Sequence, residues 1–197
     1  VLEGILCKAE GFALTLTGYD LEMGITTTVE ANVLEPGETV LPAKLLGDMV
    51  RRLSSDEVEI TCLDTGVATV KGGITEFDIM TLNPGDFPAL PNPGADQTLD
   101  IDTADLQEMV ETTLYAVSTD DKKPAHTGEL FAIEPEKLTV VALDGYRLAI
   151  IEKPVKAAKE ISIIIPAKTL SEVVKLFGEE DGVVHVAANR RFVVFSN

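Results

Sequence analysis

The ionisable residues that could carry out acid–base chemistry fall into a few short runs. Carboxylates cluster at Asp56-Glu57 and Glu179-Glu180-Asp181, and Asp120-Asp121 precedes Lys122-Lys123. Paired carboxylates can act as general acid and base, but each run follows a predicted helix in turn-like sequence, where solvated charge is the usual outcome. No P-loop, GxGxxG, GxSxG or HExxH motif accompanies them. The sequence therefore offers no set of residues for an enzyme.

Cysteine and histidine are scarce and scattered. Cys7 and Cys62 form no CxxC pair, and neither His126 nor His185 has a partner at metal-ligand spacing. We interpret both cysteines as reduced, buried and structural, which is typical of a cytosolic protein. Neither a zinc site nor any cofactor is expected.

Four basic residues form a regular pattern. Lys44 and Arg51 are seven residues apart, which places them on one stripe of a predicted helix, and Lys168 and Lys175 repeat this spacing. Two interpretations stay open. The side chains could be solvated cations of little consequence, or two equivalent helices could present them to one polyanion.

The segment 141–149 is the other unusual stretch. Asp144-Gly145 is a turn signal between two predicted strands. It predicts either a plain hairpin in which Tyr146 and Leu148 pack inward, or a partner pocket whose rim is formed by Tyr146, Arg147 and Leu148.

The whole composition is that of a globular protein. The chain has 197 residues, of which 45% are hydrophobic and 25% charged, enough for one large domain or two ordinary ones. No apolar run approaches the ~20 residues of a membrane helix, and no secretion signal is visible at the start. The net charge of −17 argues against a protein that wraps nucleic acid by bulk attraction.

An internal repeat underlies the chain. Leu14–Asp20 resembles Leu138–Asp144, and Leu41-Pro42-Ala43-Lys44 resembles Ile165-Pro166-Ala167-Lys168, both at a separation of 124 residues. Residues 74–93 and 97–124 have no counterpart in the other copy. The sequence thus predicts about one and a half repeat units, and we expect a fragment cut at both ends.

Periodicity predicts an α+β chain of short antiparallel strands with a few amphipathic helices. Helices are predicted over 42–53, 104–118 and 166–178, with Asp102 or Thr103 capping the second and Gly178 ending the third. Strands are predicted at 5–8, 13–17, 25–31, 58–62, 67–71, 76–81, 129–133, 138–143, 148–152, 161–165, 183–187 and 191–195. The Pro/Gly-rich stretch 83–94 predicts a linker, which gives domains at 1–95 and 96–197.

Several segments together resemble the bacterial DNA sliding clamp family, the beta subunit of the replicative DNA polymerase III holoenzyme. They occur in family order: Thr17–Met23, Val40–Lys44, Asp86-Phe87-Pro88, Thr127–Phe131 and Asp144–Ala149. The resemblance implies the clamp fold, in which two subunits of three similar domains form a ring around duplex DNA. It implies a non-enzymatic, cytoplasmic processivity factor that holds DNA by topology, so that little net attraction is needed. This chain would be most of the first and second domains.

The resemblance also implies partners and sites. The expected partners are duplex DNA without sequence preference, the polymerase III catalytic subunit, the clamp loader, repair and translesion proteins, and a second subunit. The implied DNA-facing residues are Lys44, Arg51, Lys168 and Lys175. Helix 104–118 departs from a basic lining, because its polar side carries Asp105, Glu108 and Glu111.

The implied partner-peptide pocket contains His126, Leu143, Gly145, Tyr146, Arg147 and Leu148. Leu143 stands where a small polar residue is more usual in the family, and His126 where an aliphatic one is. Phe77 and Ile79 match the strand that meets the next subunit. The pattern itself, in which Phe77 and Ile79 alternate with Glu76 and Asp78, predicts either a strand with one face in the core or an edge strand that pairs with another subunit.

The alternative class is an acidic, β-rich module that binds a protein or cations without a role on DNA. Cation binding would require aspartates clustered at calcium-loop spacing. The sequence contains no such cluster.

Overall fold

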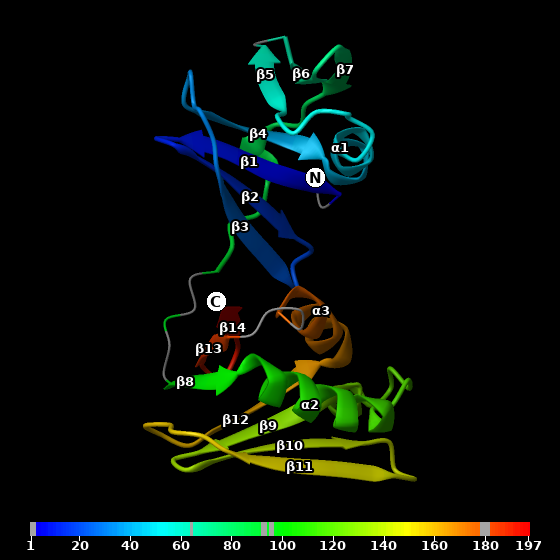
Figure 1. Cartoon of the computed structure of the whole chain (residues 1–197). Coiled ribbons are helices and arrows are strands. Elements are labelled where there is room, and N and C mark those ends of the chain that lie inside the picture. The colour runs from blue at the N-terminus through cyan, green and yellow to red at the C-terminus, as the bar shows by residue number, and fades with distance from the viewer. Residues whose placement is uncertain (1–2, 64, 92–93, 95–96, 178–181) are drawn as a thin grey trace. The chain divides into compact units, whose positions relative to one another are not determined.

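The computed structural model describes residues 3–63, 65–91, 94, 97–177 and 182–197. The chain forms two compact units, Val1–Pro91 and Asn92–Asn197, called unit 1 and unit 2 below (Figure 1). Each unit is built from a four-stranded and a three-stranded antiparallel sheet with helices packed against them. The predicted α+β class is confirmed.

Unit 1 begins with the four-stranded sheet, in the order β3-β2-β1-β4. Its strands are β1 (Gly4–Glu10), β2 (Ala13–Tyr19), β3 (Gly24–Glu30) and β4 (Gly37–Pro42). Helix α1 (Ala43–Val50) follows directly, and then β5 (Glu59–Leu63), β6 (Val67–Gly72) and β7 (Thr75–Met80) form the second sheet. A single 3₁₀ turn, η1 (Pro84–Asp86), lies in the predicted linker.

Unit 2 repeats the elements of unit 1 from β1 to β6, and one strand and one helix precede them. These are β8 (Gln97–Asp102) and α2 (Thr103–Thr113), followed by the 3₁₀ turns η2 (Leu114–Ala116) and η3 (Pro124–His126). The four-stranded sheet, in the order β11-β10-β9-β12, consists of β9 (Gly128–Glu134), β10 (Lys137–Leu143), β11 (Leu148–Pro154) and β12 (Ile161–Pro166). Helix α3 (Ala167–Phe177), β13 (Val183–Ala188) and β14 (Val193–Ser196) complete the unit, and β13 pairs with both β14 and β8.

The predicted repeat is confirmed element by element. Strands β1 to β4 begin and end 124 residues before β9 to β12, and α1 begins 124 residues before α3. The sheet orders correspond as well, since β3-β2-β1-β4 and β11-β10-β9-β12 list the strands in the same sequence. Residues at this offset are therefore structural equivalents, and Lys44 corresponds to Lys168.

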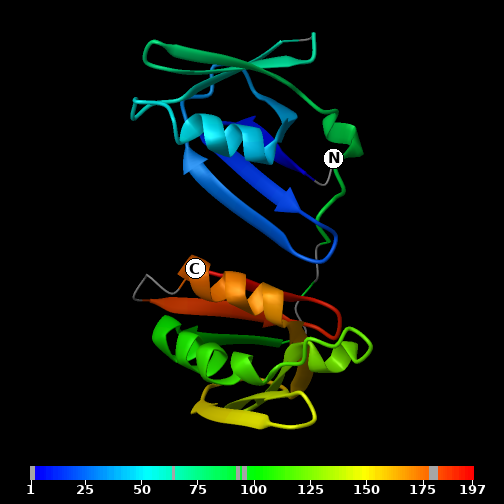
Figure 2. The ribbon, with the colours of Figure 1, turned by 90° about the vertical axis from the view of Figure 1, so that its right-hand side faces the viewer.

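The helices of unit 2 lie together on one face of the four-stranded sheet (Figure 2). Apolar residues at helical spacing on α2, namely Leu106, Met109 and Val110, are almost completely buried, as are Leu170 and Val173 on α3. They pack in one core with the inward side chains of the sheet, which include Phe131, Leu138 and Val140. Burial of such stripes, more than helix propensity, is what stabilises short helices.

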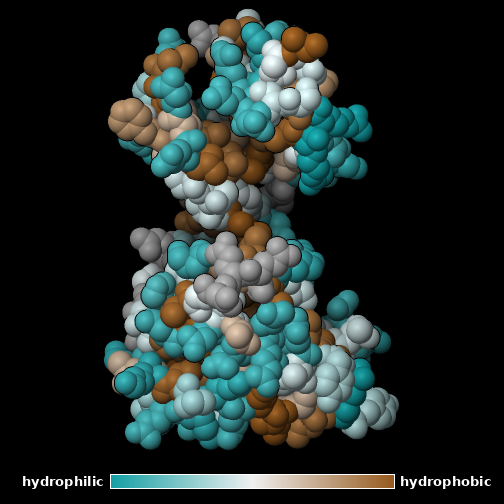
Figure 3. Space-filling model, in the orientation of Figure 1, coloured by the Kyte–Doolittle hydropathy of each residue, from teal (hydrophilic) through white to brown (hydrophobic). Residues whose placement is uncertain are grey.

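Unit 1 contains a single α-helix among its described residues, so part of its sheet is uncovered. Ile25 and Val29 on β3 are 39% and 46% exposed, and Leu45 on α1 is 51% exposed. Apolar side chains appear over β1 and β2 on the face turned toward the viewer (Figure 3). The equivalent face of unit 2 lies beneath α2.

Several predicted bounds and placements are wrong. The second helix ends at Thr113 and not at residue 118, because the chain tightens into η2. Asp102 precedes α2 as expected, but its side chain forms no capping hydrogen bond. Strands β4 and β8 were missed. The helical spacing of Leu45, Leu46, Met49, Val50 and Leu53 predicts one buried face, but Leu45 and Val50 are exposed. Gly178 and the run 179–181 lie outside the described residues.

Candidate functional site

The four predicted DNA-facing cations all reach solvent. Lys44 lies in the first turn of α1 and Lys168 at the same place on α3, and both are exposed. Arg51 directly follows α1 with a side chain 79% exposed, and Lys175 lies in the last part of α3 with a side chain 68% exposed. Two equivalent helices therefore present equivalent positive charges.

Two of these cations have local carboxylate partners. Arg51 Nη1 lies 3.5 Å from Asp48 Oδ1, and Lys175 Nζ lies 2.8 Å from Glu172 Oε1. Each partner is three residues earlier in sequence. Exposed pairs of this kind contribute little free energy, roughly 0–1 kcal/mol. A polyanion of higher charge density could therefore replace these carboxylates at a small cost in free energy.

Helix α2 differs, as its sequence indicated. It contains no Lys or Arg, and its carboxylates Asp105 and Glu108 both accept hydrogen bonds from Lys153 of β11. The hydrogen bond to Asp105, 2.8 Å long, and then the one to Glu108 raise the pKa of Lys153. A lysine from the sheet thus neutralises part of the acidic side of α2.

The β10–β11 turn positions the centre of the predicted pocket. Asp144 Oδ1 accepts the backbone N–H groups of Tyr146 at 2.9 Å and Arg147 at 3.0 Å, and its Oδ2 accepts Arg147 Nε at 2.8 Å. These hydrogen bonds, first that of Tyr146, hold the pKa of Asp144 below its usual value. Gly145 has φ +94°, a conformation that favours glycine.

Two of the predicted pocket residues, Tyr146 and Leu148, point outward and not into the core. Tyr146 is 100% exposed and Leu148 is 56% exposed, so the interpretation as an inward-packed hairpin is wrong. Leu148 lies opposite Leu143, the last residue of β10, and thereby brings two leucines together beside the turn. That these residues form the rim of a partner pocket stays a prediction.

Tyr115, which the sequence prediction did not include, contacts one of the predicted pocket residues. The Arg147 guanidinium carbon lies 5.5 Å from the centroid of its ring, within the range of a cation–π contact. The turn η2 that carries Tyr115 is held on the sheet by Ala116, which packs with Ala142 and Ala149. The available signal was an aromatic residue outside the apolar stripe of its helix.

His126 lies on η3, immediately before β9. Its carbonyl oxygen accepts the Ser118 N–H at 2.7 Å, which ties η3 to the segment after η2. Its Nδ1 atom is buried without a hydrogen-bond partner among the described residues. His126 is thus placed by local turns, whereas Leu143 to Leu148 are placed by the hairpin.

A buried carboxyl group lies on β9, next to the last residue of α2. Glu129 on β9 is 0% exposed and is hydrogen bonded to Thr113 Oγ1 at 2.9 Å, while its Oε2 has no partner among the described residues. Burial raises the pKa of Glu129 to about 7. The equivalent residue in unit 1 is Ile5, so nothing in the repeat pattern predicts an acid here.

The predicted interface strand, β7, is the edge of the β5-β6-β7 sheet. Ile79 is only 4% exposed and packs in the core of unit 1, and Phe77 is half-buried. Met80 on the opposite face is 67% exposed. The strand is therefore both one-sided and at an edge, and what it offers a partner is its backbone edge more than the Ile79 side chain.

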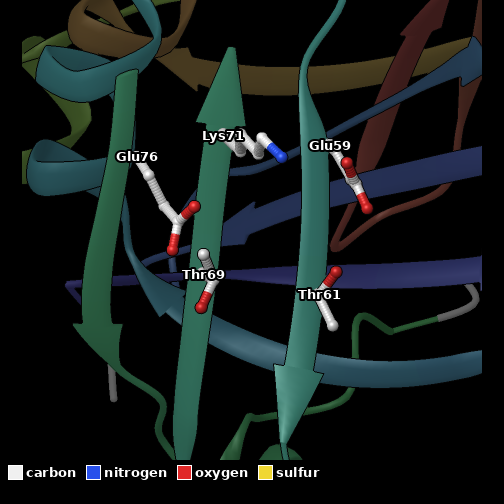
Figure 4. Close-up of a pocket in the computed structure, with 5 residues that line it drawn as sticks. All are labelled: Glu59, Thr61, Thr69, Lys71 and Glu76. Atoms are coloured by element: carbon white, nitrogen blue, oxygen red, sulfur yellow. The ribbon is translucent and has the colours of Figure 1, made fainter. Parts of the chain in front are cut away.

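The same sheet has a shallow polar depression, lined by Glu59, Thr61, Thr69, Lys71 and Glu76 (Figure 4). Lys71 lies opposite Glu59 on one side and Glu76 on the other, so opposite charges alternate across the strands. Such cross-strand pairs are ordinary for a solvated sheet face. The depression includes none of the predicted site residues.

The cysteines differ from each other. Cys7 is 4% exposed, and burial raises the pKa of its thiol to about 11, as expected for an inert structural cysteine. Cys62 is exposed, which corrects the prediction that both are buried, because it lies near the exposed end of the edge strand β5. The described residues hold no cluster of three potential metal ligands and no helix capable of crossing a membrane.

Comparisons with known proteins cover both units. The family model of the DNA polymerase III beta subunit N-terminal domain matches residues 1–91, and that of its central domain matches residues 100–197. A beta sliding clamp of Halalkalibacterium halodurans is 30% identical over 99% of this chain and 54% of its own length. One from Staphylococcus aureus is 29% identical over 96% of this chain and 53% of its own.

Solved structures agree. The DNA polymerase sliding clamp of Bacillus subtilis is similar over 100% of this chain and 54% of its own, with a TM-score of 0.95 and 26% identity. The DNA polymerase III beta subunit of Pseudomonas aeruginosa has a TM-score of 0.94 and 28% identity, over 100% of this chain and 55% of its own. The chain thus spans about half the length of the relatives it matches. With two successive clamp domain models matched in order and the clamp fold throughout, the chain belongs to the DNA polymerase III beta subunit family, the bacterial sliding clamps.

Proposed function

We propose that this chain supplies the first two domains of a DNA polymerase processivity factor that encircles duplex DNA. The observation that carries the proposal is the match of two successive clamp domains, in order, over almost all of the chain. The equivalent exposed cations support it, because the ion pairs of Arg51 and Lys175 lie on the exposed surface, where phosphates can replace the carboxylates. The predicted boundary at 95/96 falls in a region outside the described residues and stays a prediction.

The proposed action is topological and not catalytic. A closed ring stays on DNA because it surrounds it, so a few exposed cations suffice to keep phosphates centred. The net charge of −17 is compatible with this, since the acidic groups can lie away from the DNA. We propose a cytoplasmic protein without enzymatic activity that pairs with a second subunit through β7 and its neighbours.

The proposed peptide pocket is the cluster of Leu143, Tyr146, Arg147 and Leu148, with His126 and Tyr115 nearby in the fold. Exposed aromatic, Arg and Leu side chains are the types that dominate binding energy at interfaces. Arg147 is held in place by both Asp144 and Tyr115, which reduces the entropy lost on binding. The expected ligands are hydrophobic peptide tails of the polymerase, the clamp loader, and repair and translesion proteins.

A chimera tests the function. Residues 1–197 replace the aligned part of the Bacillus subtilis sliding clamp, whose backbone they match with a TM-score of 0.95. Loaded by that organism's clamp loader, the chimera is expected to stay on nicked circular DNA through gel filtration and to be lost after linearisation. The matched control is the unmodified clamp.

Two outcomes contradict the proposal. A folded, dimeric chimera that dissociates equally from circular and linear DNA would exclude topological holding by these units. A chimera that remains on linear DNA would indicate direct binding in its place. Chimeras in which only unit 1 or only unit 2 is exchanged serve as controls. They show whether a loss of DNA holding comes from a poorly joined boundary or from the unit itself.

A further inference from the structure

Helices α2 and α3 together form one surface of unit 2. They pack against each other on one face of the four-stranded sheet (Figure 2). Their buried stripes, which include Leu106 and Met109 on α2 and Leu170 and Val173 on α3, belong to one core. The opposite sides of both helices face solvent. Because packed helices lie about 8–10 Å apart, a large ligand on the solvent side of one helix also lies beside the other.

The solvent side of α3 is positively charged. It carries Lys168 and Lys175, which are both exposed, and one carboxylate, Glu172, which pairs with Lys175 at 2.8 Å. Because this pair lies on the surface, it contributes little free energy and can be replaced. The solvent side of α3 therefore attracts phosphates.

The solvent side of α2 is negatively charged. Glu108 and Glu111 are exposed, and the helix contains no Lys or Arg. Among the described residues one cation pairs with it: Lys153 of β11 donates to both Asp105 and Glu108. Glu111 accepts a hydrogen bond at 2.9 Å from the neutral amide of Gln107, which does not compensate its charge. One lysine against three carboxylates leaves α2 negative.

A duplex that contacts α3 brings its phosphates close to the carboxylates of α2. Double-stranded DNA carries one negative charge per about 1.7 Å of its axis. Exposed charges act over a screening length of about 10 Å at 0.1 M salt, which is similar to the separation of packed helices. Phosphates that Lys168 and Lys175 attract are therefore repelled at the same time by Glu108 and Glu111.

We propose that α2 repels duplex DNA, so that unit 2 contacts phosphates through α3 alone and Glu108 and Glu111 keep this contact weak. The inference rests on the proposed function, because it takes duplex DNA as the ligand of this surface. A ring that surrounds DNA needs no tight contacts, since each neutralised phosphate adds affinity that opposes movement along the duplex. The acidic side of α2 limits that affinity in unit 2.

A titration of the isotopically labelled full chain with a short DNA duplex tests the proposal and requires no ring. At an ionic strength of about 0.01 M, where the screening length is about 30 Å, the amide shifts should be larger on α3 than on α2. The α2 variant, Glu108→Gln with Glu111→Gln, removes two charges and keeps the shape of both side chains. Each carboxylate removed at roughly 10 Å from a phosphate changes the affinity about twofold in water, so we expect about fourfold tighter binding.

Two further variants localise the effect. Glu134→Gln with Glu136→Gln removes the same charge from exposed positions at the turn between β9 and β10, and should change the affinity much less. Lys168→Gln with Lys175→Gln, added to the α2 variant, should remove the gain, because α3 then no longer holds the duplex beside α2. Far-UV circular dichroism should show that all variants fold, since exposed substitutions rarely affect stability.

Three results would overturn the proposal. One is equal affinity of the unmodified chain and the α2 variant, which includes undetectable binding by both. Another is an equal gain in the Glu134 and Glu136 variant, which would assign the effect to net charge. The third is larger amide shifts on α2 than on α3 in the unmodified chain, which would show that α2 itself contacts DNA. A failure of the proposed function appears elsewhere, as a chimera that does not remain on circular DNA.

Discussion

Strands β1 to β4 of unit 1 recur 124 residues later as β9 to β12, yet the two sheets are buried differently. In unit 2, α2 covers the inner face, and Leu138 and Val140 are 1% and 0% exposed. In unit 1 the equivalents Leu14 and Leu16 are only half-buried, while the segment 82–90 runs from Val40 to Gly24 over the outer face. The comparison teaches that a repeated sheet does not itself determine which face is buried. The segments packed on each side determine it.

The largest difference is expected in the core. Leu138→Ala should lower the free energy of unfolding of unit 2 by about 4 kcal/mol, because it opens a cavity under α2. The equivalent change Leu14→Ala should cost unit 1 about 1 kcal/mol, since the site is already open to water. Urea unfolding followed by unit-specific amide signals measures both. Equal losses would show that the inner face of unit 1 is covered in solution.

The next largest effect on stability is expected from the buried carboxyl group of Glu129. The folded pKa of Glu129, about 7, exceeds its value of 4.5 in the unfolded chain, so the folded state holds the proton more tightly. The stability of unit 2 should therefore fall as the pH rises from about 5 to 8, by up to about 3 kcal/mol. Glu129→Ile, which copies Ile5, should remove this loss.

The mirror-image variant is the control. Ile5→Glu places a carboxyl group at a half-buried position beside the unit 1 core, where water still reaches it, and should produce a smaller slope near pH 7. Urea unfolding midpoints measured from pH 5 to 8 show which of these proteins lose stability as the pH rises. A flat profile for the unmodified protein would contradict the raised pKa of Glu129.

The peptide pocket gives a smaller effect. Unit 1 has Glu22, Met23 and Gly24 where unit 2 has Tyr146, Arg147 and Leu148, so only unit 2 should respond to a polymerase-tail peptide. In the chimera, Leu148→Ala should weaken that peptide about tenfold, or ~1.4 kcal/mol. Leu34→Ala, at an exposed leucine of unit 1, is the calorimetric control. Unchanged affinity in a folded Leu148→Ala protein would remove the residue from the pocket.

The smallest effect on stability is expected from the cations. Changing Lys44 and Arg51, or Lys168 and Lys175, to Glu should alter unfolding by about 0.5 kcal/mol or less. Either pair should reduce clamp loading by a similar amount without changing sequence preference, because the contacts are to phosphates. Loading assays on primed DNA measure this, with Lys122→Glu and Lys123→Glu as a control pair. Full loading by both helix variants would show that these four residues do not contact DNA.

The repeat made much of the fold predictable from sequence. A constant offset and alternating hydrophobicity located β1 to β3 and β9 to β12. Strand β4 was missed although its equivalent, β12, was predicted, so the repeat contained information that was not used. The alternation of Gln97, Leu99 and Ile101, all buried, with polar neighbours could have located β8.

Other features could not be read from local pattern. Cys62, Leu45 and Val50 have apolar-core character in sequence, and their exposure depends on which segments lie over them. Glutamate is rarely buried, so the residue type of Glu129 predicts an exposed position. Glu129 is buried because α2 packs over it. For the site, the sequence identified the β10–β11 turn, whereas the contact of Tyr115 with Arg147 required the tertiary fold.

The two strand edges that the described residues of unit 1 leave unpaired also bear on how this chain of 197 residues behaves in concentrated solution. Strand β5 is almost fully exposed, β3 is exposed along its whole length, and both end their sheets. Such edges are templates for pairing between molecules. At low ionic strength the net charge of −17 keeps molecules apart, but at 1 M salt the screening length falls to about 3 Å. High salt, which usually favours compact states, should here promote strand-to-strand aggregation, and storage at low ionic strength above the isoelectric point should prevent it.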